Sequence, residues 1–314
     1  MKTSYDRRTL AIVIASILFI STFVSCTPPK GKAYASPESA VEDFAGAVRN
    51  DDTRELVRIF GNDSKRLFTS EDPTADKNLR QDFLRLYDEK HELQADGESR
   101  RILVVGDDPW PLPIPLVKSV AGWTFDTKAG LEEIINRRIG RNELSTIQTC
   151  LAVGDAEREY YRSDRDGDDV LEYAKTFRSS PGKQDGLYWP VQDGEPESPI
   201  GELVATATGE GYGPEDTAYH GYHYKILSSQ GPAAPGGSYD YVVRDNQIGG
   251  FAVVAFPAAY GDSGVMTFML SHEGTVYQKD LGEHTDEEVK KLTSFNPDGW
   301  EKVEQKDLEP IPAS

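Results

Sequence analysis

Cysteine is scarce in this chain, with Cys26 and Cys150 the only two among 314 residues. So few thiols exclude a small scaffold held together by disulfides, and stability must come from packed cores. Basic residues are also in short supply, 34 Lys and Arg against 53 Asp and Glu, for a formal charge of -19. Phosphate backbones repel such a polyanion, so we expect no nucleic-acid partner. Hydrophobic residues, at 38%, suffice for folded cores, and the length favours two domains of the usual ~100–200 residues.

The chain also lacks a hydrophobic run long enough for an ordinary membrane anchor. Its longest apolar segment, Leu10 to Ser25, holds 12 apolar residues among 16, whereas a spanning helix needs about 20. Lys2, Arg7 and Arg8 precede it. A basic start, an apolar middle and a small-residue end are typical of a secretory signal peptide, which we predict over residues 1–25.

The signal ends in Phe23-Val-Ser-Cys26, which resembles the bacterial lipobox, with Phe23 in place of the usual Leu. The resemblance implies that Cys26 is acylated and becomes the new N-terminus, so the lipid would tie the protein to a membrane. Thr27 is not the Asp that typically retains such proteins at the inner membrane, which favours the outer membrane, facing the periplasm. The alternatives are an uncleaved anchor and a signal cut without lipid. Residues 26–36, with Pro28, Pro29 and Gly31, predict a short tether.

We predict a small α+β domain over residues 37–125. Apolar residues at helical spacing indicate a helix over residues 37–60, capped by Ser36 or Ser39, and a shorter one around residues 83–87. Strands are predicted at residues 101–105 and 121–125. Helices followed by strands resemble the cone-shaped, nuclear-transport-factor-like fold.

We predict a second, larger α+β domain over residues 126–314, with a long helix packed on an antiparallel sheet. The helical region covers residues 127–162, with Asn142 as a candidate cap for its second half. An acidic loop, residues 163–169, and a stretch rich in Gly and Pro, residues 179–237, follow it. The predicted strands are residues 222–227, 239–243, 251–256, 265–270 and 275–279.

Several phrases are similar to a bacterial family known as domain of unknown function 2950. They are WTFDT from Trp123, RRIGRNEL from Arg137, GLYWP from Gly186, HGYHYK from His220, GVMTF from Gly264 and KDLG from Lys279. The similarity covers residues 36–303 and implies no assigned activity. The second half also resembles the globular part of pilins and pseudopilins, whose Asp-rich loop can hold calcium, although this chain has no prepilin leader continuous with its long helix.

The acidic loop is the candidate metal site. Asp164, Asp166 and Asp168 alternate along it, and in a tight loop alternate carboxylates can point inward as hard oxygen ligands, with Glu172 adding another. The EF-hand pattern is not met, because Gly167 stands at the fourth loop position. We expect calcium here; magnesium, or a solvated acidic turn without metal, is the alternative.

No catalytic residue is predicted. The GDSG segment from Gly261 resembles the nucleophile segment of chymotrypsin-like proteases, but Val265 replaces a further Gly, and a turn between strands explains it better. His220 and His223 would point to opposite faces of a strand, which is unsuited to joint metal ligation. Cys150 lies on the apolar stripe of the long helix, where a buried residue is expected.

Three further features complete the sequence prediction. Arg137, Arg138 and Arg141 are balanced by nearby Glu residues, so surface ion pairs are expected; if buried between the domains, the cluster would fix their orientation. The segments Trp110–Pro115 and Gly186–Pro190 would form a binding surface if exposed, but we expect burial.

Together these features predict a lipid-anchored binding or assembly module of the cell envelope with a protein partner there, and not an enzyme. The alternative is an envelope hydrolase that cuts peptidoglycan or polysaccharide with paired carboxylates in an aromatic-lined cleft.

Overall fold

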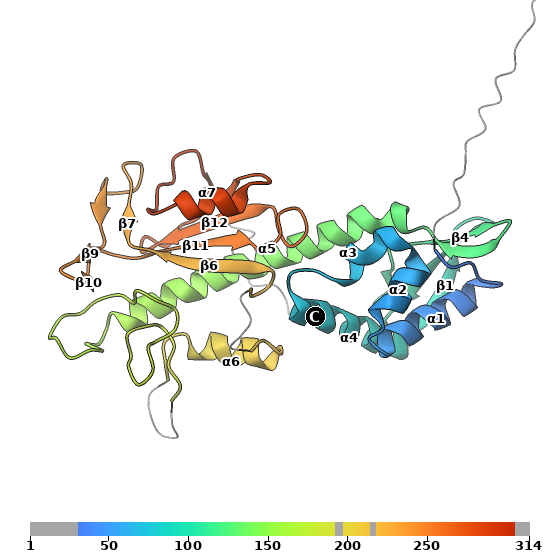
Figure 1. The fold of residues 1–314 in the computed structure, drawn as a ribbon, viewed down its shortest axis with the longest axis horizontal. Helices are drawn as coiled ribbons and strands as arrows, with labels where there is room; N and C mark the ends of the chain where they lie inside the picture. Colours follow the sequence, from blue (N-terminus) through green and yellow to red (C-terminus); the bar gives the residue numbers. More distant parts are fainter. Residues whose placement is uncertain (1–30, 192–196, 214–217, 305–314) are drawn as a thin grey trace, which may run out of the picture.

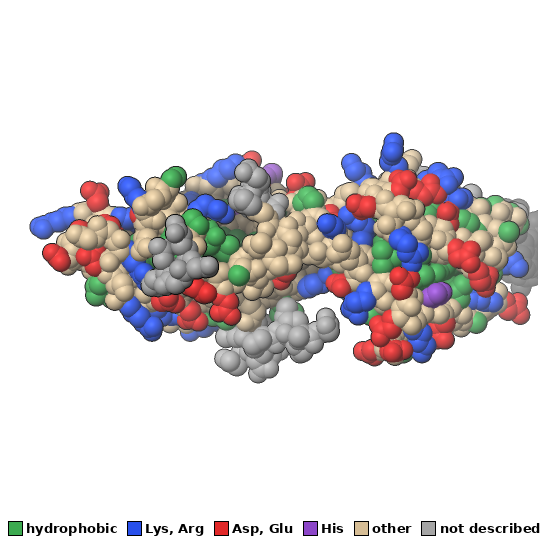
Figure 2. Space-filling view, turned by 90° about the horizontal axis from the view of Figure 1, so that it is seen from below, with side chains coloured by type: hydrophobic (Ala, Val, Ile, Leu, Met, Phe, Trp, Pro, Cys, Tyr) green, Lys and Arg blue, Asp and Glu red, His purple; other side chains and the backbone are tan. Residues whose placement is uncertain are grey.

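The computed structural model describes residues 31–191, 197–213 and 218–304. Its fold is α+β, with two lobes at either end of one long helix, α5 (Thr127–Tyr160) (Figure 1). We call residues 31–125 the N-terminal lobe and residues 163–304 the C-terminal lobe. On the face shown in Figure 2, acidic and basic side chains are intermixed over the N-terminal lobe.

The N-terminal lobe packs helices against an antiparallel sheet. The helical elements are α1 (Pro37–Arg49), α2 (Thr53–Phe60), the 3-10 turn η1 (Asn62–Ser64), α3 (Lys65–Phe68) and α4 (Pro73–Glu89). The strands are β1 (His91–Ala95), β2 (Arg100–Val105), β3 (Trp110–Pro111), β4 (Leu116–Ser119) and β5 (Gly122–Phe125), in the order β1-β2-β4-β5 with β3 beside β2. Three aromatic side chains centre the core: the Phe60 and Phe125 rings stack at 4.4 Å, and Phe44 meets Phe60 edge-on at 5.1 Å.

The predicted helix over residues 37–60 is two helices. Ser36 caps the first, as predicted, by accepting a hydrogen bond from the Ser39 amide. The break falls at Asp51, whose φ of 51° no helix accommodates, and Asp52 then caps α2 through the Glu55 amide. The strands predicted at residues 101–105 and 121–125 are confirmed as β2 and β5.

Residues 31–36, the described part of the predicted tether 26–36, belong to the N-terminal lobe and contact its strand β5. Tyr34 is buried and exchanges two backbone hydrogen bonds of 2.8 Å with Trp123 of β5. Cys26 and the predicted signal peptide lie outside the described residues.

The C-terminal lobe holds a five-stranded antiparallel sheet in the order β14-β13-β12-β11-β6. These strands are β6 (Tyr222–Leu227), β11 (Ala252–Pro257), β12 (Met266–Ser271), β13 (Val276–Asp280) and β14 (Glu301–Lys302). Two small pairs lie beyond it: β7 (Ser229–Gln230) with β8 (Tyr239–Asp240), and β9 (Val242–Val243) with β10 (Asn246–Gln247). The helices are α6 (Gly201–Gly209) and α7 (Thr285–Lys291).

Helix α5 covers one face of this sheet and α7 lies on the other (Figure 1). Because side chains alternate along a strand, Val253 of β11 joins the core under α5, whereas Val254 joins the core under α7. Gly154 lets α5 approach the sheet closely, since a Cβ there would lie 2.7 Å from Leu270 of β12. The first turns of α5 instead pack on the N-terminal core through Leu131 and Ile134. The helix therefore contacts both lobes.

The long helix was predicted correctly, but the cap within it was wrong. Asn142 is buried in an unbroken helix, and its side-chain amide donates to the Ser263 carbonyl at 2.9 Å. The predicted strand at residues 239–243 is two short ones, β8 and β9. Helix α6 lies within the Gly- and Pro-rich stretch in which no helix was predicted.

Candidate functional site

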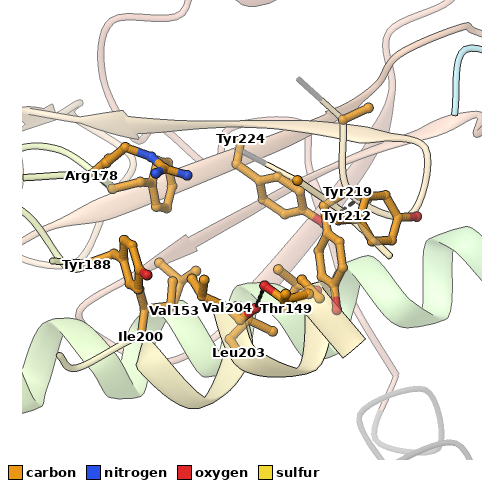
Figure 3. A pocket seen from close by; sticks show the side chains of 15 residues that line it. Thr149, Val153, Arg178, Tyr188, Ile200, Leu203, Val204, Tyr212, Tyr219 and Tyr224 are labelled. Carbon is orange, nitrogen blue, oxygen red and sulfur yellow. Dashed lines mark hydrogen bonds between the residues drawn. The ribbon is translucent and has the colours of Figure 1, made fainter. Parts of the chain in front are cut away.

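A pocket of about 440 Å³ opens between α5, α6 and β6, with the segment around residues 177–188 as its fourth wall (Figure 3). Helix α5 contributes Thr149 and Val153, and α6 contributes Leu203, Val204 and neighbouring small residues. This volume falls in the range of ~300–1,000 Å³ typical of small-ligand sites. It follows that the pocket could hold a small molecule.

The walls are aromatic and aliphatic. Four tyrosines line the pocket, Tyr188, Tyr212, Tyr219 and Tyr224, and Figure 3 shows Tyr224 and Tyr188 on facing walls. Burial raises the pKa of Tyr224, Tyr212 and Tyr219, and the neighbouring carboxylates Asp72 and Glu210 raise the last two further. These phenols stay protonated at neutral pH, so they add no charge to the pocket.

Several hydroxyl donors around the pocket are already used within the protein. Thr149 donates to the Ser145 carbonyl at 2.9 Å, and Thr208 donates to the Val204 carbonyl at 2.7 Å. The Tyr212 hydroxyl donates to Asp72 at 2.7 Å. A ligand therefore meets mainly rings and methyl groups.

Arg178 is the one charged residue among the described residues that line the pocket. It is exposed, and its guanidinium lies 5.5 Å from the centre of the Tyr188 ring, a cation–π arrangement. Figure 3 shows the guanidinium directed into the pocket. Within residues 31–191, 197–213 and 218–304, no ion pair or hydrogen bond of this guanidinium is found. The pocket is thus an apolar cavity with a positive charge at one wall.

One pocket wall is tied to the N-terminal lobe. Asp72, the cap of α4, accepts hydrogen bonds from the Tyr212 hydroxyl at 2.7 Å and from the Gly221 amide at 2.8 Å. Gly221 and His220 form the tight turn that enters β6, both with positive φ, as a two-residue hairpin requires. Burial lowers the pKa of His220, although Glu210, 3.5 Å away, opposes this.

The structure brings three of the four predicted metal ligands together. Carboxylate oxygens of Asp164, Asp166 and Asp168 lie within 4.8 Å of one another, on an exposed loop. Glu172 is not among them, because its buried carboxylate accepts the Gln247 amide at 2.8 Å and pairs with Lys175 at 3.5 Å. Hydrogen bonds from the Gly167 and Asp169 amides lower the pKa of Asp164. Three hard oxygens suit calcium, which takes 6–8 ligands in all, so water or carbonyls would complete the shell.

The remaining sequence candidates have structural explanations. Ser263 of the GDSG turn is buried, and its hydroxyl bonds to the Ala259 backbone. His220 lies in the turn before β6 and not on the strand with His223, so the two were not placed correctly. Cys150 is buried, as predicted, and burial raises its pKa to about 12.

The arginine cluster divides between the two predicted roles. Arg137 forms a surface pair with Glu133 at 2.7 Å. Arg138 is buried between the lobes, where it donates to the Arg66 and Leu67 carbonyls and lies 3.3 Å from Asp262. Arg138 thus orients the lobes mostly through backbone carbonyls, with one carboxylate nearby.

The aromatic segments are buried in part. Leu187 and Trp189 of Gly186–Pro190 are buried, whereas Tyr188 faces the pocket. Leu112 and Ile114 are buried while Trp110 stays exposed beneath Arg137. Sequence reasoning singled out Tyr188 and Tyr224 within their phrases but missed the pocket, because its floor is the unpredicted helix α6.

Comparison with known proteins adds a family and no activity. A family model described as "Protein of unknown function (DUF2950)" matches residues 31–303. Neither a curated protein nor a solved structure matches the chain. Among the described residues, none of the helices combines the length and the apolar character that crossing a membrane would require.

Proposed function

The chain belongs to the DUF2950 family, and the description of that family names no activity. We therefore propose a function from the geometry of the chain itself. The protein is a lipid-anchored binding module of the cell envelope, and the pocket between α5, α6 and β6 is its ligand site. The pocket is the observation that supports this best, since it combines a suitable volume, an aromatic lining and one directed charge. The described residues that line it include no Asp or Glu, so it does not support the alternative of a hydrolase with paired carboxylates.

Filling the pocket tests this function. Val204 on α6 lines it, and Val204→Trp would place an indole in the cavity. We expect native mass spectrometry of protein purified from its own envelope to show a bound small molecule that this variant has lost. Thr206→Trp, at an exposed position two residues along α6 that does not line the pocket, is the control that should keep the ligand. A ligand retained equally by both variants would contradict the proposed site.

The anchor is a proposal that rests on the sequence of residues 1–26. We expect Cys26→Ser to abolish incorporation of a labelled fatty acid, because the thiol is the atom acylated. Cys150→Ala provides the matched control, since it removes the other cysteine, a buried one, and should leave labelling intact. Label that persists in Cys26→Ser would place the lipid elsewhere, and a wild-type protein without label would show that there is none.

Calcium at the acidic loop is likewise a proposal. If calcium binds the native loop alone, a concentration of 100 times the Kd should stabilise the protein by about 2.7 kcal/mol and raise its Tm. Asp166→Asn should remove this response, and Asp169→Asn, outside the three-carboxylate cluster, should preserve it. A Tm unchanged by calcium or chelator in the wild-type protein would end this proposal.

A further inference from the structure

The residues that line the pocket favour an apolar ligand. Apart from Arg178 it presents rings and aliphatic groups, and three of its hydroxyls already donate within the protein: Thr149, Thr208 and Tyr212. A glycan needs many donors and acceptors for its own hydroxyls, and unpaired polar groups in a buried site weaken binding. An apolar ligand body fits these walls without that loss.

Arg178 adds a second requirement at one wall of the same cavity. Its guanidinium points into the pocket over Tyr188 and has no acidic partner among the described residues (Figure 3). A guanidinium prefers planar or tetrahedral oxyanions, which it can bind through two parallel N–H donors. A ligand with an apolar body and one anionic head would therefore satisfy both parts of the site.

We infer that the pocket binds an amphiphile made of a single acyl chain and one anionic head, a carboxylate or a phosphate. The chain lies between Val153 of α5 and Leu203 and Val204 of α6, against the Tyr224 ring, and the head meets Arg178. This inference rests on the proposed binding function and names the class of its ligand.

Titration calorimetry below the micelle concentration tests the chain. Saturated carboxylates of increasing length, octanoate, decanoate and laurate, should bind progressively tighter, by about tenfold for each two added methylenes while they still fit. Val204→Trp should remove the gain for the longest chain first, because it shortens the cavity. Affinity that does not depend on chain length would overturn the acyl-chain part of the inference.

Changing the head group tests Arg178. Laurate and dodecyl phosphate should both lose about five- to tenfold in affinity in Arg178→Ala, whereas neutral dodecanol should not change. Arg178→Lys should restore part of the loss because it keeps the charge, and Lys183→Ala, an exposed cation paired with Asp185, is the control that should bind as the wild type does. Comparing the affinities of the wild-type protein for laurate and dodecyl phosphate shows which head group is preferred. Equal affinity of Arg178→Ala and wild type for both anions would overturn the anionic-head part.

The experiments distinguish a wrong ligand class from a wrong binding site. If laurate and dodecyl phosphate do not bind, but a ligand from the envelope is lost in Val204→Trp, the site stands and the ligand class is wrong. If Val204→Trp changes neither the acyl ligands nor the envelope ligand, the pocket is not the binding site and both proposals fall.

Discussion

Replacing Glu157 with Gln should remove most of a loss of stability that the wild-type protein shows between pH 5 and pH 8. Glu157 lies on α5 with no exposed surface, and burial raises its pKa to about 8. One oxygen accepts the Ala174 amide at 2.9 Å, and the other has no hydrogen-bond partner within the described residues. The carboxyl is therefore neutral in the folded protein across a range in which it is ionised once the chain unfolds.

The sign of the pH effect follows from proton binding. Between the unfolded pKa near 4.5 and the folded pKa near 8, the native state holds the extra proton. The free energy of unfolding then falls as pH rises, by up to about 1.4 kcal/mol per pH unit. Below the unfolded pKa this contribution is fully present, and above the folded pKa it is gone. Gln cannot ionise. The free energy of unfolding of Glu157→Gln should therefore change less with pH across this window, and at pH 8 it should exceed that of the wild type.

Urea unfolding at pH 5, 6, 7 and 8 measures this slope directly. Glu159→Gln is the matched control, because it makes the same chemical change at an exposed position on the same helix. It should keep the wild-type slope. If the free energies of unfolding of Glu157→Gln and the wild type change with pH in the same way over the four values, the buried carboxyl is not the titrating group.

Glu157 also illustrates what a sequence can and cannot reveal. The long helix that carries it was predicted nearly to its ends. A carboxylate on a helix is usually solvated, however, and only the contact with Ala174, seventeen residues away, shows that this one is buried. Burial of a charged residue is set by tertiary packing, which no local pattern encodes.

The pocket was missed for a related reason. Helix α6 consists of the sequence GELVATATG, in which no residue is fully buried, so it lacks the apolar stripe by which helices are recognised. It is capped by no side chain and lies in a stretch full of Gly and Pro, which favours turns. Four of the five strands of the main sheet, β6, β11, β12 and β13, were in contrast found within a residue or two, and β11 shows why with its continuous apolar run AVVAF; the exposed two-residue strand β14 was not predicted. Buried elements could be predicted from the sequence, whereas the partly exposed wall of the site could not.

The two lobes are joined near the pocket by Asp72, whose position in the sequence gives no hint of this role. It is 3% exposed and accepts three hydrogen bonds: one from the Ala75 amide at the start of α4, and two from the C-terminal lobe. The latter come from the Tyr212 hydroxyl and the Gly221 amide. A sequence pattern could have indicated the helix cap, since Asp followed by Pro is a common helix start, but not the contacts across 140 and 149 residues.

Asp72→Ala should therefore destabilise the protein far more than loss of a helix cap alone. The cap is worth about 1 kcal/mol, and each hydrogen bond to a charged acceptor adds about 1.5–3 kcal/mol. We expect a total loss of about 4–7 kcal/mol in urea unfolding, because the Gly221 amide and the Tyr212 hydroxyl are left buried without an acceptor. Amide hydrogen exchange in the His220–Gly221 turn should accelerate as well.

Asp52→Ala separates the two contributions. Asp52 caps α2 in the same way, through the Glu55 amide at 3.0 Å, but it is exposed and makes no hydrogen bond to the C-terminal lobe among the described residues. It should cost about 1 kcal/mol and leave exchange in the turn unchanged. Tyr212→Phe removes one of the two hydrogen bonds that Asp72 accepts from the C-terminal lobe, and its loss of stability should fall between those of the two variants. Equal losses in Asp72→Ala and Asp52→Ala would mean that Asp72 acts as a helix cap only.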